Sequence, residues 1–265
     1  MLDEDRRGWV EAREQAFHDR IAAELDPRSM PPDRPIQFDE LLLDAIGDVE
    51  GKAVLDLGCG AGDISLKLVQ RGAKVTGVDI SERLIEVAGE RADHFPPGAP
   101  VSFVAAPADR TGLAAAEFDL IVGKWILHHV ALDPVLTEIG RLLRPGGSGV
   151  FFENQLTNPI LAFGREHLIG RRGVRRIGTS DEHPLRPADF ALLGERFARV
   201  QLRHPDFCFF ELLDRQLLDF RYPRITGFVR ALDRRLWAAW PPIRRFSYHV
   251  VIRLAEPRSG MRRRV

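Results

Sequence analysis

The chain has 265 residues, of which 45% are hydrophobic and 29% are charged. This balance excludes disordered, collagen-like and coiled-coil proteins and suits one α/β-sized unit with additions. The net charge is zero, yet residues 1–150 hold 16 Lys and Arg against 26 Asp and Glu, while residues 151–265 hold 22 against 12. The cations of the second half are all arginines, which either grip an anionic partner or, as we favour, cover solvated helix faces.

The first 50 residues contain two expected helices, near 8–25 and 37–47, on either side of a proline-rich break. We expect residues 1–50 to form a helical lid at the ligand-binding edge. The segment 1–7 is too acidic for a signal peptide, and no stretch reaches the ~18 apolar residues that cross a bilayer. Two cysteines are too few for a disulfide framework. The sequence therefore predicts a cytoplasmic protein with no transmembrane segment and no metal.

Residues 51–154 alternate between short apolar runs and segments of helix length. The apolar runs are 53–57, 74–78, 101–105, 118–122 and 149–152. The expected helices between them are 63–71, 81–93 and 133–143. Continuous apolar runs indicate strands that are buried on both faces. The alternation predicts a doubly wound, mostly parallel α/β sheet.

The pattern is looser after residue 154. Residues 155–186 have no clear strand and are expected to be an inserted substrate segment. The C-terminal part of the sheet, 187–256, should contain a helix at 187–194, strands at 197–202 and 247–254, and a helical insertion at 205–245. Residues 257–265 are expected to be a disordered basic tail. The insertion carries an aromatic stripe that we expect to be core, comprising Phe207, Phe209, Phe210, Phe220, Tyr222, Phe228, Trp237 and Trp240.

The strongest local pattern is a strand that runs into three alternate glycines. Gly58, Gly60 and Gly62 follow this strand and precede a helix. Glycine is needed where the backbone turns with positive φ and where a ligand lies against the main chain. Asp79 ends the next strand, where a carboxylate accepts hydrogen bonds from both hydroxyls of a ribose. The pattern therefore predicts a nucleoside-binding site.

The glycine spacing distinguishes between nucleoside ligands. It lacks the third glycine of the dinucleotide pattern G-x-G-x-x-G, and Asp56 and Asp63 would repel a pyrophosphate. Two acids suit a ligand that carries a cationic group. S-adenosylmethionine (SAM) is such a ligand.

Four motifs in order resemble the class I SAM-dependent methyltransferases, of the small-molecule type often called type 11. They are the glycine loop at 54–62, the acidic strand end at 75–81, the segment 118–129 with its Leu-His-His, and residues 138–147 before the fifth strand. The resemblance covers residues 54–153. It implies a seven-stranded Rossmann-like sheet, a SAM-binding core at 51–154 and methyl transfer that releases S-adenosylhomocysteine.

The resemblance also implies a set of cofactor-binding residues. Carried over by position, they are Asp56, Gly58, Cys59, Gly60, Gly62, Asp79, Ile80, Ala108, Asp109, Gly123 and Lys124. Asp79 would hold the ribose, and Ile80 would pack on the adenine. Pro107 stands where the family often has an Asp for the adenine amino group. The adenine contact is therefore expected from Ala108 and Asp109.

Methyl transfer from a sulfonium needs an oriented acceptor and, for a hydroxyl, a base. The candidate catalytic residues are His128, His129 and Glu153, each of which has a structural alternative as a local hydrogen-bonding group. The candidate acceptor-binding residues are His18, Asn154, Arg165 and His167. We expect the acceptor to lie between the cofactor and the segments 155–186 and 205–245, because inserted segments supply specificity in doubly wound folds.

The expected partner is a small-molecule acceptor that is methylated at O, N or C, with anionic, natural-product or lipid-like acceptors among the options. Nucleic acid is not favoured: Gly123–Ile126 lacks the Asn/Asp-Pro-Pro-aromatic motif, and neither cysteine follows a proline. Two alternatives stay open, a SAM-binding relative with another reaction and a non-catalytic SAM-binding partner protein. The sequence leaves the oligomeric state open.

Overall fold

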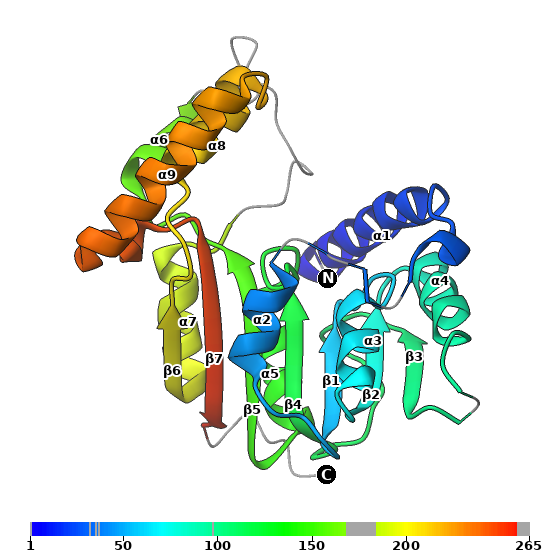
Figure 1. Ribbon diagram of the computed structural model, residues 1–265. Helices are drawn as coiled ribbons and strands as arrows, with labels where there is room; N and C mark the ends of the chain where they lie inside the picture. The colour runs from blue at the N-terminus through cyan, green and yellow to red at the C-terminus, as the bar shows by residue number, and fades with distance from the viewer. Residues whose placement is uncertain are drawn as a thin grey trace.

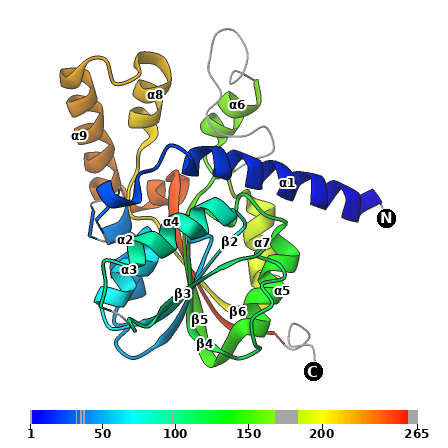
Figure 2. The ribbon, with the colours of Figure 1, turned by 90° about the vertical axis from the view of Figure 1, so that its right-hand side faces the viewer.

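The computed structural model describes residues 2–31, 33–34, 36, 38–96, 98–167 and 184–258, without the side chains of residues 2–7. A seven-stranded sheet in the order β3-β2-β1-β4-β5-β7-β6 has helices on both faces (Figures 1 and 2). The strands are β1 (Ala53–Leu57), β2 (Lys74–Asp79), β3 (Val101–Ala105), β4 (Phe118–Lys124), β5 (Leu143–Asn154), β6 (Phe197–Arg203) and β7 (His249–Pro257). The pairs among β1 to β5 are parallel, and β7 is antiparallel to β5 and β6. The predicted doubly wound, mostly parallel fold is confirmed.

Most helices occupy the segments that the sequence predicts, but α1 begins earlier than expected and α6 has no counterpart among the predicted helices. They are α1 (Leu2–Ala22), α2 (Asp39–Ile46), α3 (Asp63–Gln70), α4 (Glu82–Ala92), α5 (Leu132–Leu142), α6 (Pro159–His167), α7 (Pro187–Arg196), α8 (Phe209–Leu218) and α9 (Pro223–Ala239), with 3-10 helices η1 (Pro27–Ser29) and η2 (Pro241–Phe246). Local caps fix where several begin. The Ser81 hydroxyl accepts the Leu84 N–H at 3.1 Å at the start of α4. None of the helices in the described residues is long and apolar enough to cross a membrane.

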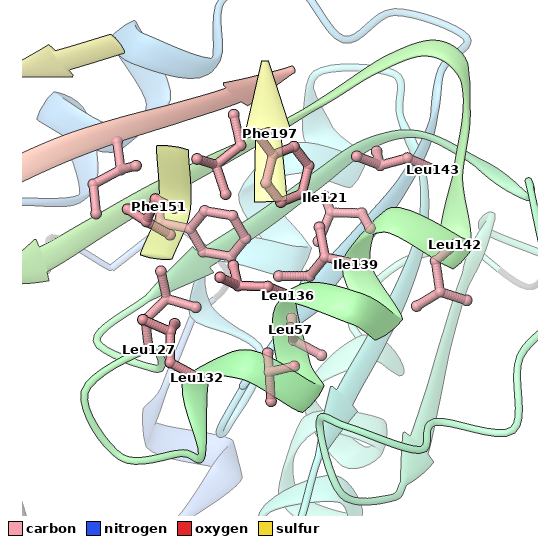
Figure 3. Packing of buried hydrophobic residues seen from close by; sticks show 14 of the residues in the cluster. Leu57, Ile121, Leu127, Leu132, Leu136, Ile139, Leu142, Leu143, Phe151 and Phe197 are labelled. Carbon is pink, nitrogen blue, oxygen red and sulfur yellow. The ribbon is translucent and has the colours of Figure 1, made fainter. Parts of the chain in front are cut away.

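Apolar packing covers both faces of the sheet. On one face, Leu136 of α5 lies in a cluster with Phe151 and Phe197, where α7 meets β6 (Figure 3). On the other face, Leu42 of α2 belongs to a cluster that contains Phe152. Phe151 and Phe152 are adjacent in β5 and point to opposite faces, and both are fully buried. This two-sided burial explains why the central strands are continuous apolar runs in the sequence.

Helix α1 lies across the end of the sheet where the parallel strands finish (Figure 2). It contacts α4, and polar contacts join it to the core. The Ser81 hydroxyl donates to the Asp19 carboxylate, and Arg110 forms an ion pair with Glu11. The position is that of a lid over the ligand edge of a doubly wound fold.

Arg91 of α4 joins the N-terminal segment to the glycine loop. Its side chain is fully buried, and its Nε donates to the Met30 carbonyl at 3.1 Å. The guanidinium also donates to the Ala61 carbonyl and lies 2.8 Å from Asp63. Arg34 holds the same Asp63 carboxylate through two hydrogen bonds of 2.7 Å. Asp63 is therefore occupied by two arginines, and the pKa of Arg91 is lowered by its burial.

Substituting Arg91 with methionine is expected to lower the free energy of unfolding by about 1–3 kcal/mol, because buried carbonyl acceptors lose their donor. Methionine keeps much of the apolar stem, and Arg34 still neutralises Asp63. Urea unfolding measures the change. Arg83→Met on the same helix is the matched control, since Arg83 is exposed and pairs only with Glu86 in the described residues. Equal stability of the two variants would contradict the anchoring role.

The C-terminal insertion departs from expectation. Helices α8 and α9 stand beyond the edge of the sheet (Figure 1). Phe207 is buried, but Tyr222, Phe228 and Trp240 are 48%, 67% and 57% exposed. The expectation that the aromatic stripe forms core is therefore wrong for much of its length. Within the described part of the chain no second layer covers the outer face of this projecting pair, so helical spacing alone does not bury these rings. The expected basic tail lies, from residue 259, outside the described residues.

Candidate active site

A cavity of about 710 Å³ opens between the carboxyl ends of β1, β2 and β4 and the underside of α1. The core contributes Gly58, Gly60, Val78, Asp79, Ile80, Leu84, the segment 106–109, Lys124, Trp125, Ile126 and residues 129–135; α1 contributes Val10, Glu11, Glu14 and His18. The volume falls in the range of small-molecule sites. The cavity lies at the edge where doubly wound folds bind ligands.

The glycine loop forms one wall, and at two of its positions the backbone has a positive φ, which favours glycine. Gly58 has a φ of 74°, and a Cβ there would lie 2.8 Å from the Ile126 side chain. Gly60 has a φ of 53°, and no described protein atom lies within 4 Å of the place a Cβ would take. The main chain at Gly60 is therefore open to a ligand on this side.

Asp79 is oriented by two backbone donors. Its Oδ2 accepts the Gly60 N–H at 2.8 Å, and its Oδ1 accepts the Ser81 N–H at 3.0 Å. A carboxylate has about four lone-pair sites, so capacity is left for two hydroxyl donors. Ile80, Ala108 and Asp109 line the same end of the cavity. The structure thus brings together the residues that were expected to hold the ribose and the adenine.

Asp56 does not line the cavity, and the expectation of a direct contact with a cofactor is corrected. Its side chain is 2% exposed and accepts a hydrogen bond of 2.6 Å from Ser65. Burial, as the largest cause, raises the pKa of Asp56 to about 7. The carboxylate therefore joins the end of β1 to α3 through Ser65.

The stability of the protein should fall as Asp56 ionises. Because the pKa is about 7 in the folded chain and about 3.9 in an unfolded one, the folded state binds the proton more tightly. Stability is therefore lost as the pH rises from about 4 to 7 and stays low above pH 7. Asp56→Asn should remove this loss. The free energy of unfolding of the variant, relative to that of the wild type, should therefore rise by about 2 kcal/mol from pH 5 to pH 8. Urea unfolding at both pH values measures the difference, with exposed Asp93→Asn as the control. A difference that does not change with pH would contradict the prediction.

Cys59, Gly62 and Gly123 also lie outside the lining and shape the site by packing. Cys59 is buried, and burial raises the pKa of its thiol well above the usual value. Gly62 begins α3 with a φ of 80°. A Cβ at Gly123 would lie 2.7 Å from the Ile126 side chain. These three expected contacts are corrected to supporting roles.

Lys124 and Trp125 line the cavity at the end of β4. The Lys124 ammonium lies 2.5 Å from Asp39, which also pairs with Lys67 at 2.5 Å. Trp125 has a φ of 59°, a strained value for a tryptophan. Its indole nitrogen is buried with no hydrogen-bond partner in the described residues. Trp125 was not among the sequence candidates, although its place directly after the fourth strand could have suggested it.

The two adjacent histidines have different surroundings. His128 is 4% exposed, and its Nδ1 lies 2.6 Å from Glu153 Oε2. The other oxygen of Glu153 accepts the N–H groups of Ile126 and Leu127 at 2.9 and 2.8 Å. Neither His128 nor Glu153 lines the cavity. The pair therefore holds the turn after β4, and the expectation that both are catalytic is corrected to a positioning role.

His129 lies inside the cavity beside the lid. Its Nδ1 is 3.2 Å from the Glu14 carboxylate of α1. His18, one turn further along α1, lies 3.7 Å from the same Glu14 oxygen, and the His18 and His129 rings meet edge to face at 6.0 Å. The lid thus supplies a carboxylate and an imidazole that converge on a core imidazole. Glu14 was not a sequence candidate, because nothing in the sequence places residue 14 next to residue 129.

The other expected acceptor residues do not reach this cavity. Asn154 pairs with His249 in the sheet. Arg165 and His167 lie on α6, where His167 stacks on Phe163. Their assignment to acceptor binding stays a prediction that the lining of this cavity does not support. Most of the segment 155–186 beyond His167 lies outside the described residues.

Two groups in the described residues have the spacing of metal ligands. They are Glu14, His18 and His129, and Asp206, Cys208 and His249, each with its ligand atoms within 4.8 Å of one another. The sequence analysis expected no metal because the chain has only two cysteines. That count says nothing about either of these groups, so the expected absence of a metal stays a prediction.

The fold and the cavity define a nucleoside-binding, doubly wound α/β protein. Residues 54–147 match the family described as "Methyltransferase domain". The chain is 32% identical over 169 residues to a ubiquinone biosynthesis O-methyltransferase of Aeromonas salmonicida, covering 61% of this chain and 68% of that protein. It is 32% identical over 159 residues to a protein of the same name from Bordetella avium, covering 57% and 64%. The chain belongs to the class I SAM-dependent methyltransferase family.

Two solved structures share the fold. Haemonchus contortus phosphoethanolamine N-methyltransferase 1, in complex with phosphoethanolamine and S-adenosylhomocysteine, has a TM-score of 0.58 at 17% identity and covers 96% of this chain and 50% of that chain. The [4+2]-cyclase SpnF has a TM-score of 0.54 at 17% identity and covers 86% and 85%. The matched region spans less than two thirds of the Bordetella avium relative. The activities in the names of these proteins therefore describe those proteins and not this chain.

Proposed function

We propose that the protein transfers a methyl group from SAM to a hydroxyl of a small-molecule acceptor held in the cavity beneath α1. The observation that carries this proposal is a single cavity that combines the Gly58–Gly60 turn and Asp79 with His129 and the Glu14 carboxylate. One part suits a nucleoside, and the other suits an acceptor that must lose a proton.

The residues present fit the cofactor. Asp79 would accept hydrogen bonds from the two ribose hydroxyls, while Ile80 would pack on the adenine and Asp109 would lie at its edge. The open main chain at Gly60 would lie against the methionine part. Lys124, which shares the Asp39 carboxylate with Lys67, would attract the carboxylate of that part. When bound, SAM supplies the methyl group on a sulfonium.

On the acceptor side, His129 would take the proton of the hydroxyl as the carbon–oxygen bond forms and the carbon–sulfur bond breaks. The imidazole would keep this proton, and its positive charge would lie beside the Glu14 carboxylate. Glu14 would orient the ring and stabilise the imidazolium. The Trp125 indole N–H, which is a buried donor, would hold an acceptor oxygen. Proximity and orientation would supply most of the rate enhancement.

The relatives named O-methyltransferases support an oxygen acceptor, and His129 supports it independently. The second candidate is another reaction on the same fold, which SpnF, named a [4+2]-cyclase, illustrates. A base beside a carboxylate favours proton removal, so we place methyl transfer first.

The test is an assay of label transfer from methyl-labelled SAM to fractionated small-molecule extracts, with His129→Ala as the matched inactive variant. Label in an acceptor, lost in the variant, is the expected result. SAM binding without label transfer to any fraction would favour a binding protein, and conversion of an acceptor without label would favour the second candidate.

The remaining assignments are part of this proposal. We infer a helical lid at 1–50, a SAM-binding core at 51–154, an inserted segment at 155–186 and a C-terminal part of the sheet at 187–256 with its helical insertion at 205–245. We expect the protein in the cytoplasm and a small molecule, not a nucleic acid, as its acceptor.

A further inference from the structure

The hairpin formed by α8 and α9 (residues 209–239) is fastened by buried polar contacts. The Asp233 carboxylate accepts the N–H groups of Phe210 and Glu211 at 3.1 and 2.9 Å and so caps the start of α8. The Thr226 hydroxyl donates to Asp214 at 2.6 Å. Asp214, Thr226 and Asp233 are at most 7% exposed. These contacts fix one helix against the other.

Several large apolar side chains of the hairpin are exposed. On α8, Leu213 and Leu217 are 36% and 70% exposed and lie one turn apart. At the start of α9, Tyr222, Ile225 and Phe228 recur every third residue and are 48%, 43% and 67% exposed. The turn that joins the helices is the end of the hairpin farthest from the sheet in both ribbon views (Figures 1 and 2). An exposed apolar group of this kind marks a surface that meets a partner.

Positive charge surrounds these apolar residues. Arg221 and Arg224 alternate with Tyr222 and Ile225 along the chain, and both are exposed. Neither has an acidic partner within the described part of the chain. Exposed Arg215, Arg234 and Arg235 are likewise without one there. Asp219 is the one exposed acid on the described hairpin, since Asp214 and Asp233 are buried and Glu211 pairs with Arg230.

We propose that the turn end of the hairpin, comprising Leu217, Arg221, Tyr222, Arg224, Ile225 and Phe228, docks on the surface of an anionic lipid bilayer. Apolar and aromatic side chains would enter the boundary between headgroups and acyl chains, while the arginines would contact lipid phosphates. A second copy of the chain fits less well, because pairing two such ends would bring like charges together.

The position of the hairpin gives this docking a consequence. The hairpin and α1 rise from the same end of the sheet (Figure 1), and the cavity opens beneath α1. A bilayer held by the hairpin would therefore lie toward the end of the molecule that carries the cavity. The docking surface is defined by residues of the α8–α9 hairpin. The docking proposal therefore does not depend on the proposed methyl transfer.

The experiment measures co-sedimentation of the full chain with vesicles of phosphatidylcholine alone or with 30% phosphatidylglycerol. The wild type should bind the anionic vesicles and release them at high salt. Arg221→Gln with Arg224→Gln should weaken binding by about 30-fold. Leu217→Ser with Phe228→Ser should weaken it by about tenfold or more. The controls are Leu202→Ser and Arg203→Gln, which alter an exposed leucine and an exposed arginine on β6.

Several outcomes would overturn the proposal. One is a wild type that fails to sediment with anionic vesicles, and another is a loss of binding in the controls as large as in the hairpin variants. A concentration-dependent dimer in analytical ultracentrifugation that Phe228→Ser dissociates, without vesicle binding, would assign the surface to a second copy. SAM binding by calorimetry should be unchanged in every hairpin variant. Failure of the docking is thereby distinguished from failure of the proposed function.

Discussion

Replacing Asp79 by alanine is expected to weaken the binding of SAM by about 30- to 1000-fold, roughly 2–4 kcal/mol. The carboxylate would accept two hydrogen bonds from the ribose, and each is stronger for being charge-assisted. The same carboxylate holds the Gly60 and Ser81 N–H groups, so its loss also loosens the glycine turn. Isothermal titration calorimetry with SAM and with S-adenosylhomocysteine measures the effect.

The matched control for Asp79→Ala is Asp93→Ala, because Asp93 is an exposed acid just after α4. That variant should bind SAM like the wild type. NAD should not bind measurably to either protein, since the loop lacks the dinucleotide spacing. Unchanged SAM affinity in the Asp79 variant would show that the ribose lies elsewhere.

Substitution of His129 by alanine should lower kcat by about 10²- to 10⁴-fold while the affinity for SAM stays close to that of the wild type. His129 is the imidazole of the His128–His129 pair that lines the cavity, and Glu14 lies 3.2 Å from its Nδ1. Removing the base should slow the step in which the acceptor loses its proton. Steady-state kinetics with saturating SAM and the acceptor from the labelling assay measures kcat.

Two further variants separate catalysis from packing. Glu14→Gln should lower kcat less than His129→Ala, because it removes the charge that stabilises the imidazolium but leaves the imidazole in place. His94→Ala, an exposed histidine beyond α4, should leave kcat unchanged. If His129→Ala kept full kcat, the acceptor would need no base here, and His129 would only join the lid to the core.

The strands were predictable because a strand that is buried on both faces is a run of consecutive apolar residues. Runs such as 118–122 and 149–152 are apolar on both faces, and β4 and β5 contain them. The adjacent histidines 128 and 129 illustrate the opposite case. The sequence places both after the fourth strand, but only the turn, held by Glu153, decides that one faces the cavity and the other is buried.

The sequence alone determined the doubly wound sheet, the glycine turn and Asp79, because these depend on periodicity and on residue types that local backbone geometry demands. The tertiary structure decided that Asp56 is buried against Ser65, that α1 brings Glu14 to His129, and that Tyr222 and Phe228 are exposed. Each of these features depends on how segments far apart in the chain pack, or fail to pack, against one another. No local pattern encodes them, since they depend on which layers of the fold meet.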